Sequence, residues 1–138
     1  MAKGYVYEHV VTPADATFRG LAYDGSYHRW ACAAREQMIT EYIDSTDVIW
    51  PGFLVGESYL RYRSPAFMND RLEVRVTVGD HVPEKGWARL EFRFVNQTSL
   101  NVLAEGYQTI FFTDPETGKR VPIPEEFLKL IEAVGEVD

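Results

Sequence analysis

Four side chains between residues 15 and 35 are of types that take part in reactions at a carbonyl group. Asp15 and Asp24 are carboxylates that could accept a proton from a water within hydrogen-bond reach. Thr17 can orient a water or bond to a carbonyl, but it needs a partner base to act as a nucleophile. Arg35 could bind a carbonyl or carboxylate, or its charge could be solvated beside the glutamates that follow it.

Each carboxylate also has a structural interpretation. Asp24 precedes a helical pattern and could cap it, whereas Asp15 follows Pro13 and could be a turn residue. We rank Asp24 above Asp15 as a candidate base. The single cysteine, Cys32, permits no intrachain disulfide or thiolate cluster. The three histidines do not show metal-ligand spacing, so we predict neither a metal nor a cofactor.

A helix must position most of these residues. Its apolar stripe follows the 3.6-residue period and consists of Tyr27, Trp30, Ala31, Ala34, Met38 and Tyr42. Asp24 or Ser26 can accept hydrogen bonds from the amides of the first turn, so we expect the helix to run from there to about Ile43.

The rest of the chain is organised around strands. A first strand is predicted at 5–11, and alternating patterns predict four more at 53–63, 72–78, 87–95 and 102–113, joined by short turns that favour antiparallel hairpins. Pro124 opens a short final helix. One long helix against a five-stranded antiparallel sheet is an α+β architecture, and 138 residues suit a single domain over 1–138.

The charge balance limits the partners. Fourteen Lys and Arg against 21 Asp and Glu give a net charge of -7, which disfavours non-specific attraction to nucleic acid or anionic membranes. We find no stretch of 18 uncharged apolar residues and no signal-peptide pattern in the first residues, and we expect a cytoplasmic protein.

Three stretches resemble the hotdog-fold 4-hydroxybenzoyl-CoA thioesterase family. Residues 20–36, which begin Gly-Leu-Ala-Tyr-Asp-Gly-Ser-Tyr-His-Arg-Trp, look like that family's segment at the start of its long helix. In 59–74, Tyr62, Pro65, Asp70 and Leu72 match its spacing, and 114–124 is similar to its closing turn. The opening Tyr-Val-Tyr-Glu-His-Val-Val resembles the thioesterases of enediyne polyketide pathways. The resemblance implies a sheet wrapped around the long helix.

The same resemblance implies a site. Backbone N–H groups near Tyr23, Asp24 and Gly25 would stabilise an oxyanion, and Tyr23, Gly25 and Tyr27 are assigned to substrate binding. Thr17 stands where the benzoyl-CoA branch has its catalytic aspartate. The enediyne branch also lacks that carboxylate and uses a helix arginine, which Arg35 matches. Thr17, Asp24 and Arg35 are therefore the predicted catalytic residues.

The expected activity is hydrolysis of an acyl-CoA or acyl-carrier-protein thioester to the free acid. The alternatives are a non-catalytic acyl-binding protein, because the usual carboxylate is absent, and, less favoured, a hotdog dehydratase. A sheet with an open edge on one helix predicts a homodimer joined edge to edge, or a homotetramer built from it.

Overall fold

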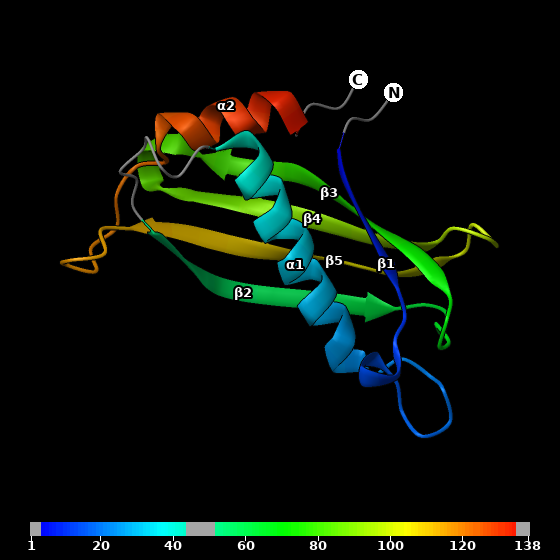
Figure 1. Ribbon diagram of the computed structural model, residues 1–138. Helices are drawn as coiled ribbons and strands as arrows, with labels where there is room; N and C mark the ends of the chain where they lie inside the picture. Colours follow the sequence, from blue (N-terminus) through cyan, green and yellow to red (C-terminus); the bar gives the residue numbers. More distant parts are fainter. Residues whose placement is uncertain (1–3, 44–51, 135–138) are drawn as a thin grey trace.

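The computed structural model describes residues 4–43 and 52–134. The order of elements is β1 (Tyr5–Val10), η1 (Pro13–Asp15), α1 (Asp24–Tyr42), β2 (Gly52–Tyr62), β3 (Arg71–Val82), η2 (Pro83–Lys85), β4 (Trp87–Asn96), β5 (Val102–Thr113) and α2 (Glu125–Val134). Figure 1 shows α1 lying across one face of the sheet. The five predicted strands and two predicted helices are all present.

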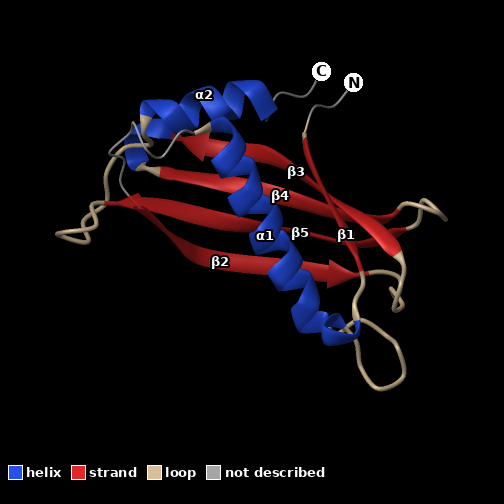
Figure 2. Cartoon of the chain, viewed as in Figure 1, coloured by secondary structure: helices blue, strands red, loops and turns tan. Residues whose placement is uncertain are grey.

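The five strands form one antiparallel sheet with the order β1-β3-β4-β5-β2. Strands β1 and β2 are at opposite edges of the sheet, and α1, which lies across the sheet face, comes between them in the chain (Figure 2). A sheet that curves around one long helix in this way is the hotdog fold, as predicted.

The core lies between α1 and the inner face of the sheet. On β3 the residues Leu72, Val74, Val76 and Val78 are buried, and on β4 the buried residues are Ala88, Leu90, Phe92 and Phe94. They pack in one cluster with the α1 stripe, whose members are buried except Tyr42, which is 48% exposed. Fully burying a Val, Leu or Phe side chain contributes about 1.5–3 kcal/mol, so this cluster fixes where α1 lies. The short helix α2 extends the same cluster with Phe127, whose ring lies 4.9 Å from that of Phe112.

Two local predictions are wrong. The N-cap of α1 is Tyr23 and it makes no side-chain cap hydrogen bond, so neither Asp24 nor Ser26 caps the helix as expected. The Ser26 hydroxyl instead donates to the backbone carbonyl of Asp15, because the preceding loop folds back against the first turn. Strand β3 also continues to Val82, past a register shift between Val78 and His81 that breaks its alternating pattern.

The outer face of the sheet carries mixed charges. Arg63 pairs with Glu105, Arg75 with Glu73 on its own strand, and Arg89 with Glu57 at 4.0 Å. In the part of the chain that the structure describes, no helix is long and apolar enough to cross a membrane.

Candidate active site at the start of α1

A tight loop leads into α1. The Thr17 N–H donates to the Leu21 carbonyl at 2.6 Å, and the Gly20 N–H donates to the Thr17 carbonyl at 2.9 Å. Gly20 has φ of +85°, a conformation that glycine adopts without the steric cost borne by other residues. The loop is then held on the sheet side, because the Ala22 N–H donates to the Ala66 carbonyl at 2.9 Å. The helix therefore begins from a fixed loop.

Among the described residues, the first turn of α1 has two N–H donors without an acceptor. The Tyr23 N–H donates to the Asp15 carbonyl at 2.9 Å, and the Ser26 N–H donates to the Tyr23 carbonyl at 3.1 Å. Within residues 4–43 and 52–134, no acceptor is found for the backbone N–H of Asp24 or Gly25. Both residues are exposed, and a Cβ placed on Gly25 would meet no atom within 4 Å. Two donors at the positive end of a 19-residue helix form a site for a negatively charged oxygen.

Asp24 and Tyr62 lie together beside these donors. The Tyr62 hydroxyl donates to the Asp24 carbonyl at 3.1 Å. Burial, and then the negative charge of Asp24, raise the pKa of Tyr62, which keeps its hydroxyl protonated and able to donate. The sequence comparison had noted Tyr62 only as a family match. The period-two pattern of its strand gave no sign that it would reach the start of the helix.

Thr17 and Tyr27 are placed differently. The Thr17 hydroxyl accepts from the Arg19 N–H at 3.3 Å within the exposed turn. Tyr27 is buried in the core against Trp30, Tyr62 and Phe94. Burial raises the pKa of Tyr27, and the nearby backbone of Ala66 opposes that shift. The Tyr27 ring packs edge-on against the Tyr62 ring from the core side. Of the two tyrosines predicted to bind substrate, Tyr23 is exposed and Tyr27 is buried.

Arg35 is distant from the other predicted catalytic residues. It follows Asp24 by eleven helical positions, about 16 Å along the axis. Its side chain is 12% exposed, so its interpretation as a solvated charge is wrong. The guanidinium donates to Glu36 and to the Gln108 side-chain oxygen, both at 2.8 Å, and lies 5.2 Å from the centre of the Phe53 ring. Within one chain, Arg35 therefore lies about three helical turns from Asp24.

A row of polar groups connects the start of α1 to Arg35, and we call it the seam. From α1 it contains His28, Cys32 and Arg35, and from the sheet Tyr62, Ser58 and Gln108. His28 Nδ1 lies 3.3 Å from the Ser58 hydroxyl, and the Gln108 amide lies 3.7 Å from the Cys32 sulfur. Gln108 is 3% exposed, an unusual place for an amide, and the sequence analysis missed it. The available signal was a glutamine beside the apolar run of β5 from Ile110 to Phe112.

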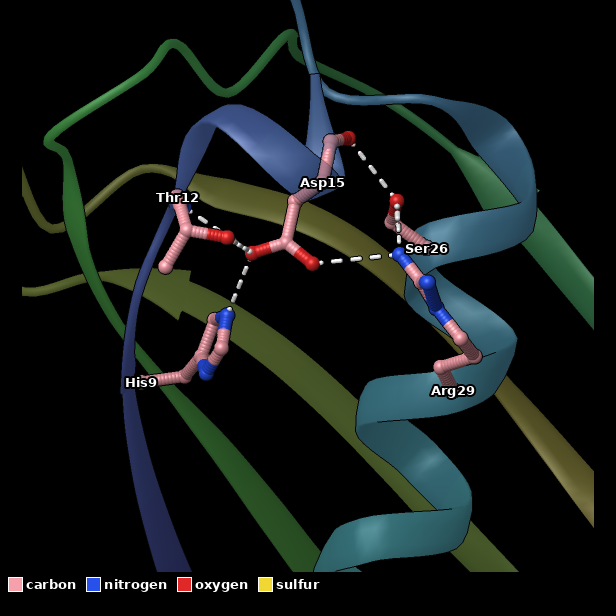
Figure 3. Close-up of polar contacts among 5 residues, drawn as sticks. All are labelled: His9, Thr12, Asp15, Ser26 and Arg29. Atoms are coloured by element: carbon pink, nitrogen blue, oxygen red, sulfur yellow. Dashed lines mark hydrogen bonds and ion pairs between the residues drawn. The ribbon is translucent and has the colours of Figure 1, made fainter.

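The other carboxylate, Asp15, is the centre of a cluster shown in Figure 3. One carboxylate oxygen accepts from the Thr12 N–H and hydroxyl, both at 2.9 Å, and lies 2.7 Å from His9 Nε2. The other accepts from Arg29 at 3.1 Å. Asp15 is therefore occupied by protein groups and does not face an open site.

The fold and the open first turn of α1 define a hotdog-fold protein of the acyl-thioesterase type. The chain belongs to the thioesterase-like superfamily, whose family profile matches residues 11–131. The predicted membership of the thioesterase family is confirmed at the level of the superfamily. No curated protein sequence matches the chain.

Solved structures share the fold over nearly the whole chain. A 1,4-dihydroxy-2-naphthoyl-CoA thioesterase from Synechocystis is 18% identical, with a TM-score of 0.83, over 93% of this chain and 95% of its own. The dynemicin thioesterase, studied for polyene binding, is 20% identical with a TM-score of 0.84 over 98% and 99%. A gentisyl-coenzyme A thioesterase is 21% identical with a TM-score of 0.76 over 89% and 98%.

Proposed function

We propose that the chain hydrolyses an acyl thioester whose carbonyl oxygen is held by the backbone N–H groups of Asp24 and Gly25. The observation that carries this proposal is that both donors are free and exposed at the start of α1. Fixed donors aimed at a developing oxyanion stabilise the tetrahedral intermediate without needing a nearby acid. Such a site can operate although Thr17 replaces the usual aspartate.

The attacking water would be activated by Asp24. Its carboxylate is exposed beside the free donors, whereas that of Asp15 is filled by four hydrogen-bond contacts. Thr17 would position the water or the substrate. The competing mechanism, polarisation of the carbonyl without a base, is distinguished by replacing Asp24.

The acyl group would lie along the seam, with its far end at Arg35 and Gln108. Arg35 already holds the Gln108 oxygen, and a substrate carbonyl or carboxylate offers the same acceptor chemistry. Arg35 lies about 16 Å along the helix axis from Asp24. The proposed position of the acyl group therefore favours a chain with a polar oxygen at roughly that distance from its thioester, as in an oxidised polyketide chain, over a plain alkanoyl chain. The carrier would be coenzyme A or an acyl carrier protein.

We also propose that two chains pair through their β2 edges. Strand β2 is at the edge of the sheet and is exposed along most of its length, including Leu54 at 63%. An open strand of this kind is a template for pairing. Leu54→Glu should therefore shift the light-scattering mass toward the 15.8 kDa of one chain, whereas the control Leu100→Glu, in the turn before β5 and 73% exposed, should not. Equal masses for both variants would contradict pairing through this edge.

A tetramer would use the outer face of the sheet. The alternating arginines and glutamates there line a depression of about 870 Å³. A two-fold axis brings a patch against itself, and a patch with both signs of charge is complementary to its own copy.

The direct test of the activity is thiol release from aromatic, polyene and straight-chain acyl-CoA thioesters, followed with a thiol reagent. Turnover above the uncatalysed rate is expected, greatest for chains with a distal carbonyl or carboxylate. Saturable binding of these thioesters without any thiol release would overturn hydrolysis in favour of the non-catalytic acyl-binding alternative.

A further inference from the structure

Asp15 joins three separate elements through its side chain and its backbone. Its carboxylate bonds to His9 on β1, to Thr12 at the start of η1, and to Arg29 in the second turn of α1. Its carbonyl accepts the Tyr23 N–H at 2.9 Å and the Ser26 hydroxyl at 2.8 Å. Asp15 thus links the first turn of α1 to the edge strand β1.

Arg29 closes the arrangement on the helix side. One guanidinium nitrogen lies 3.1 Å from the Asp15 carboxylate and 2.9 Å from the Ser26 hydroxyl, so it bridges the loop and the helix. Ser26 is held between Asp15 and Arg29 (Figure 3). Tyr23 occupies the N-cap position of α1, and its side chain does not cap the first-turn amides as Ser or Asp would, so α1 has no side-chain cap.

This arrangement determines which N–H groups remain free. The Asp15 carbonyl takes the Tyr23 N–H and the Tyr23 carbonyl takes the Ser26 N–H, which leaves those of Asp24 and Gly25 between them. The first turn of α1 determines the direction of the Asp24 and Gly25 N–H bonds, and the hydrogen bonds to the Asp15 carbonyl hold that turn in place. A shift of only ~1 Å in such groups can cost about 100-fold in rate.

The bonding around Asp15 also opposes a role as a proton acceptor. Burial disfavours its charge, but the Thr12 N–H, His9 and the Thr12 hydroxyl outweigh burial and lower the pKa of Asp15. The groups that face it are His9 from β1 and Arg29 from α1, both of which favour the ionised form. The charged carboxylate of Asp15 instead forms hydrogen bonds with His9, Thr12 and Arg29.

We propose that Asp15 is a positioning residue that aims the Asp24 and Gly25 N–H groups at the substrate oxygen, acting through Ser26 and Arg29. This inference rests on the proposed function, and it assigns to the Asp15 cluster a part that a turn residue or a relocated base would not have.

The experiment compares Asp15→Asn with Asp114→Asn. Asp114 is a matched control because its carboxylate also accepts loop amides, from Glu116 at 2.8 Å and Thr117 at 3.4 Å, in the loop after β5. We expect Asp15→Asn to lower kcat by about 10- to 100-fold with KM changed less than about threefold. Asp114→Asn should leave both constants within about twofold of wild type. Equal kcat values for the two folded variants would overturn the proposal.

A second measurement does not depend on activity. Backbone amide exchange at Tyr23 and Ser26, whose N–H groups are hydrogen-bonded in this arrangement, can be followed by NMR and should become faster in Asp15→Asn but not in Asp114→Asn. If the wild-type protein releases no thiol, the proposed function fails, yet the exchange data still decide whether Asp15 fixes these amides. Unchanged exchange at both positions would refute the positioning role.

Arg29→Gln provides a milder variant if Asp15→Asn does not fold. The Arg29 side chain is 59% exposed, so this substitution empties no buried site. It removes the bridge to Asp15 and Ser26, and we expect a smaller fall in kcat, about 3- to 10-fold, with the same changes in amide exchange. Wild-type kcat and exchange in this variant would contradict the inference.

Discussion

Replacing Asp24 by proline tests the free N–H donor directly. Asp24 is the first residue of α1, and proline is favoured at this position because its missing N–H has no partner in the helix. The preceding residue, Tyr23, has φ of -65° and ψ of 146°, the extended conformation that a following proline requires. Asp24→Pro should therefore fold and lose one donor of the proposed oxyanion site.

The expected magnitude follows from the two roles of Asp24. Removing one oxyanion donor costs about 100- to 1000-fold in kcat, or about 2.7–4 kcal/mol. Asp24→Ala removes the same carboxylate but keeps the N–H, so the ratio of the two variants isolates the donor. Proline at a compatible position changes the free energy of unfolding by only about 0.4–1 kcal/mol, in the stabilising direction.

The assay is thiol release at saturating acyl-CoA for wild type, Asp24→Ala, Asp24→Asn and Asp24→Pro, with urea unfolding as the control for folding. We expect Asp24→Pro to be at least about 100-fold slower than Asp24→Ala. A carboxylate acting as base would make Asp24→Ala and Asp24→Asn themselves about 100-fold slower than wild type. Equal rates for Asp24→Pro and Asp24→Ala, with both folded, would refute the assignment of the Asp24 N–H.

The remaining predictions concern Thr17, Arg35 and Asp15. Thr17→Ala should reduce kcat by about tenfold or less, because one hydrogen bond is worth about 0.5–1.5 kcal/mol, and a complete loss with an intact circular dichroism spectrum would contradict its supporting role. Arg35→Ala should lower turnover, as the family resemblance implies, and wild-type turnover at saturating substrate would remove Arg35 from the mechanism. The same substitution should reduce the free energy of unfolding, measured in urea, by about 1–3 kcal/mol, because it leaves the buried Gln108 oxygen without its partner. Because the pKa of Asp15 is lower in the folded protein than its ordinary 3.8, the stability it adds is present above pH 3.8 and is lost as the pH falls below that value. The difference in free energy of unfolding between wild type and Asp15→Asn, measured in urea, should thus become smaller below about pH 4. A difference that becomes larger as the pH falls would contradict this prediction.

Local patterns in the sequence determined the elements of the fold. The stripe from Tyr27 to Met38 repeats at helical spacing, and Leu72 to Val78 alternates at strand spacing, so each element has one apolar side that must be buried. Unpaired amides at the start of α1 could also be predicted, because every helix leaves its first N–H groups without intrahelical partners. The family resemblance placed them near Tyr23, Asp24 and Gly25, but the Tyr23 N–H donates to the Asp15 carbonyl.

The sequence could not show what the loop before α1 does. Asp15 and Ser26 both appeared to be ordinary turn or cap residues, since such assignments use only neighbours along the chain. In the structure the Ser26 hydroxyl, inside the first turn of α1, donates to the Asp15 carbonyl, and the Asp15 carboxylate bonds to His9 from β1 and to Arg29 from α1. These contacts depend on where α1 crosses the sheet.

The same limit applies to Arg35. Its position off the apolar stripe predicted solvent exposure, because a helical wheel treats only one side of the helix as covered. The curvature of the sheet brings β5 around the helix, so that Arg35 reaches Gln108, 73 residues later in the chain. The sequence by itself determined which residue types could do chemistry and which elements carry them. Only the tertiary structure decided which of them meet, because the hydrogen bonds that aim or occupy each group come from elements that are distant in the chain.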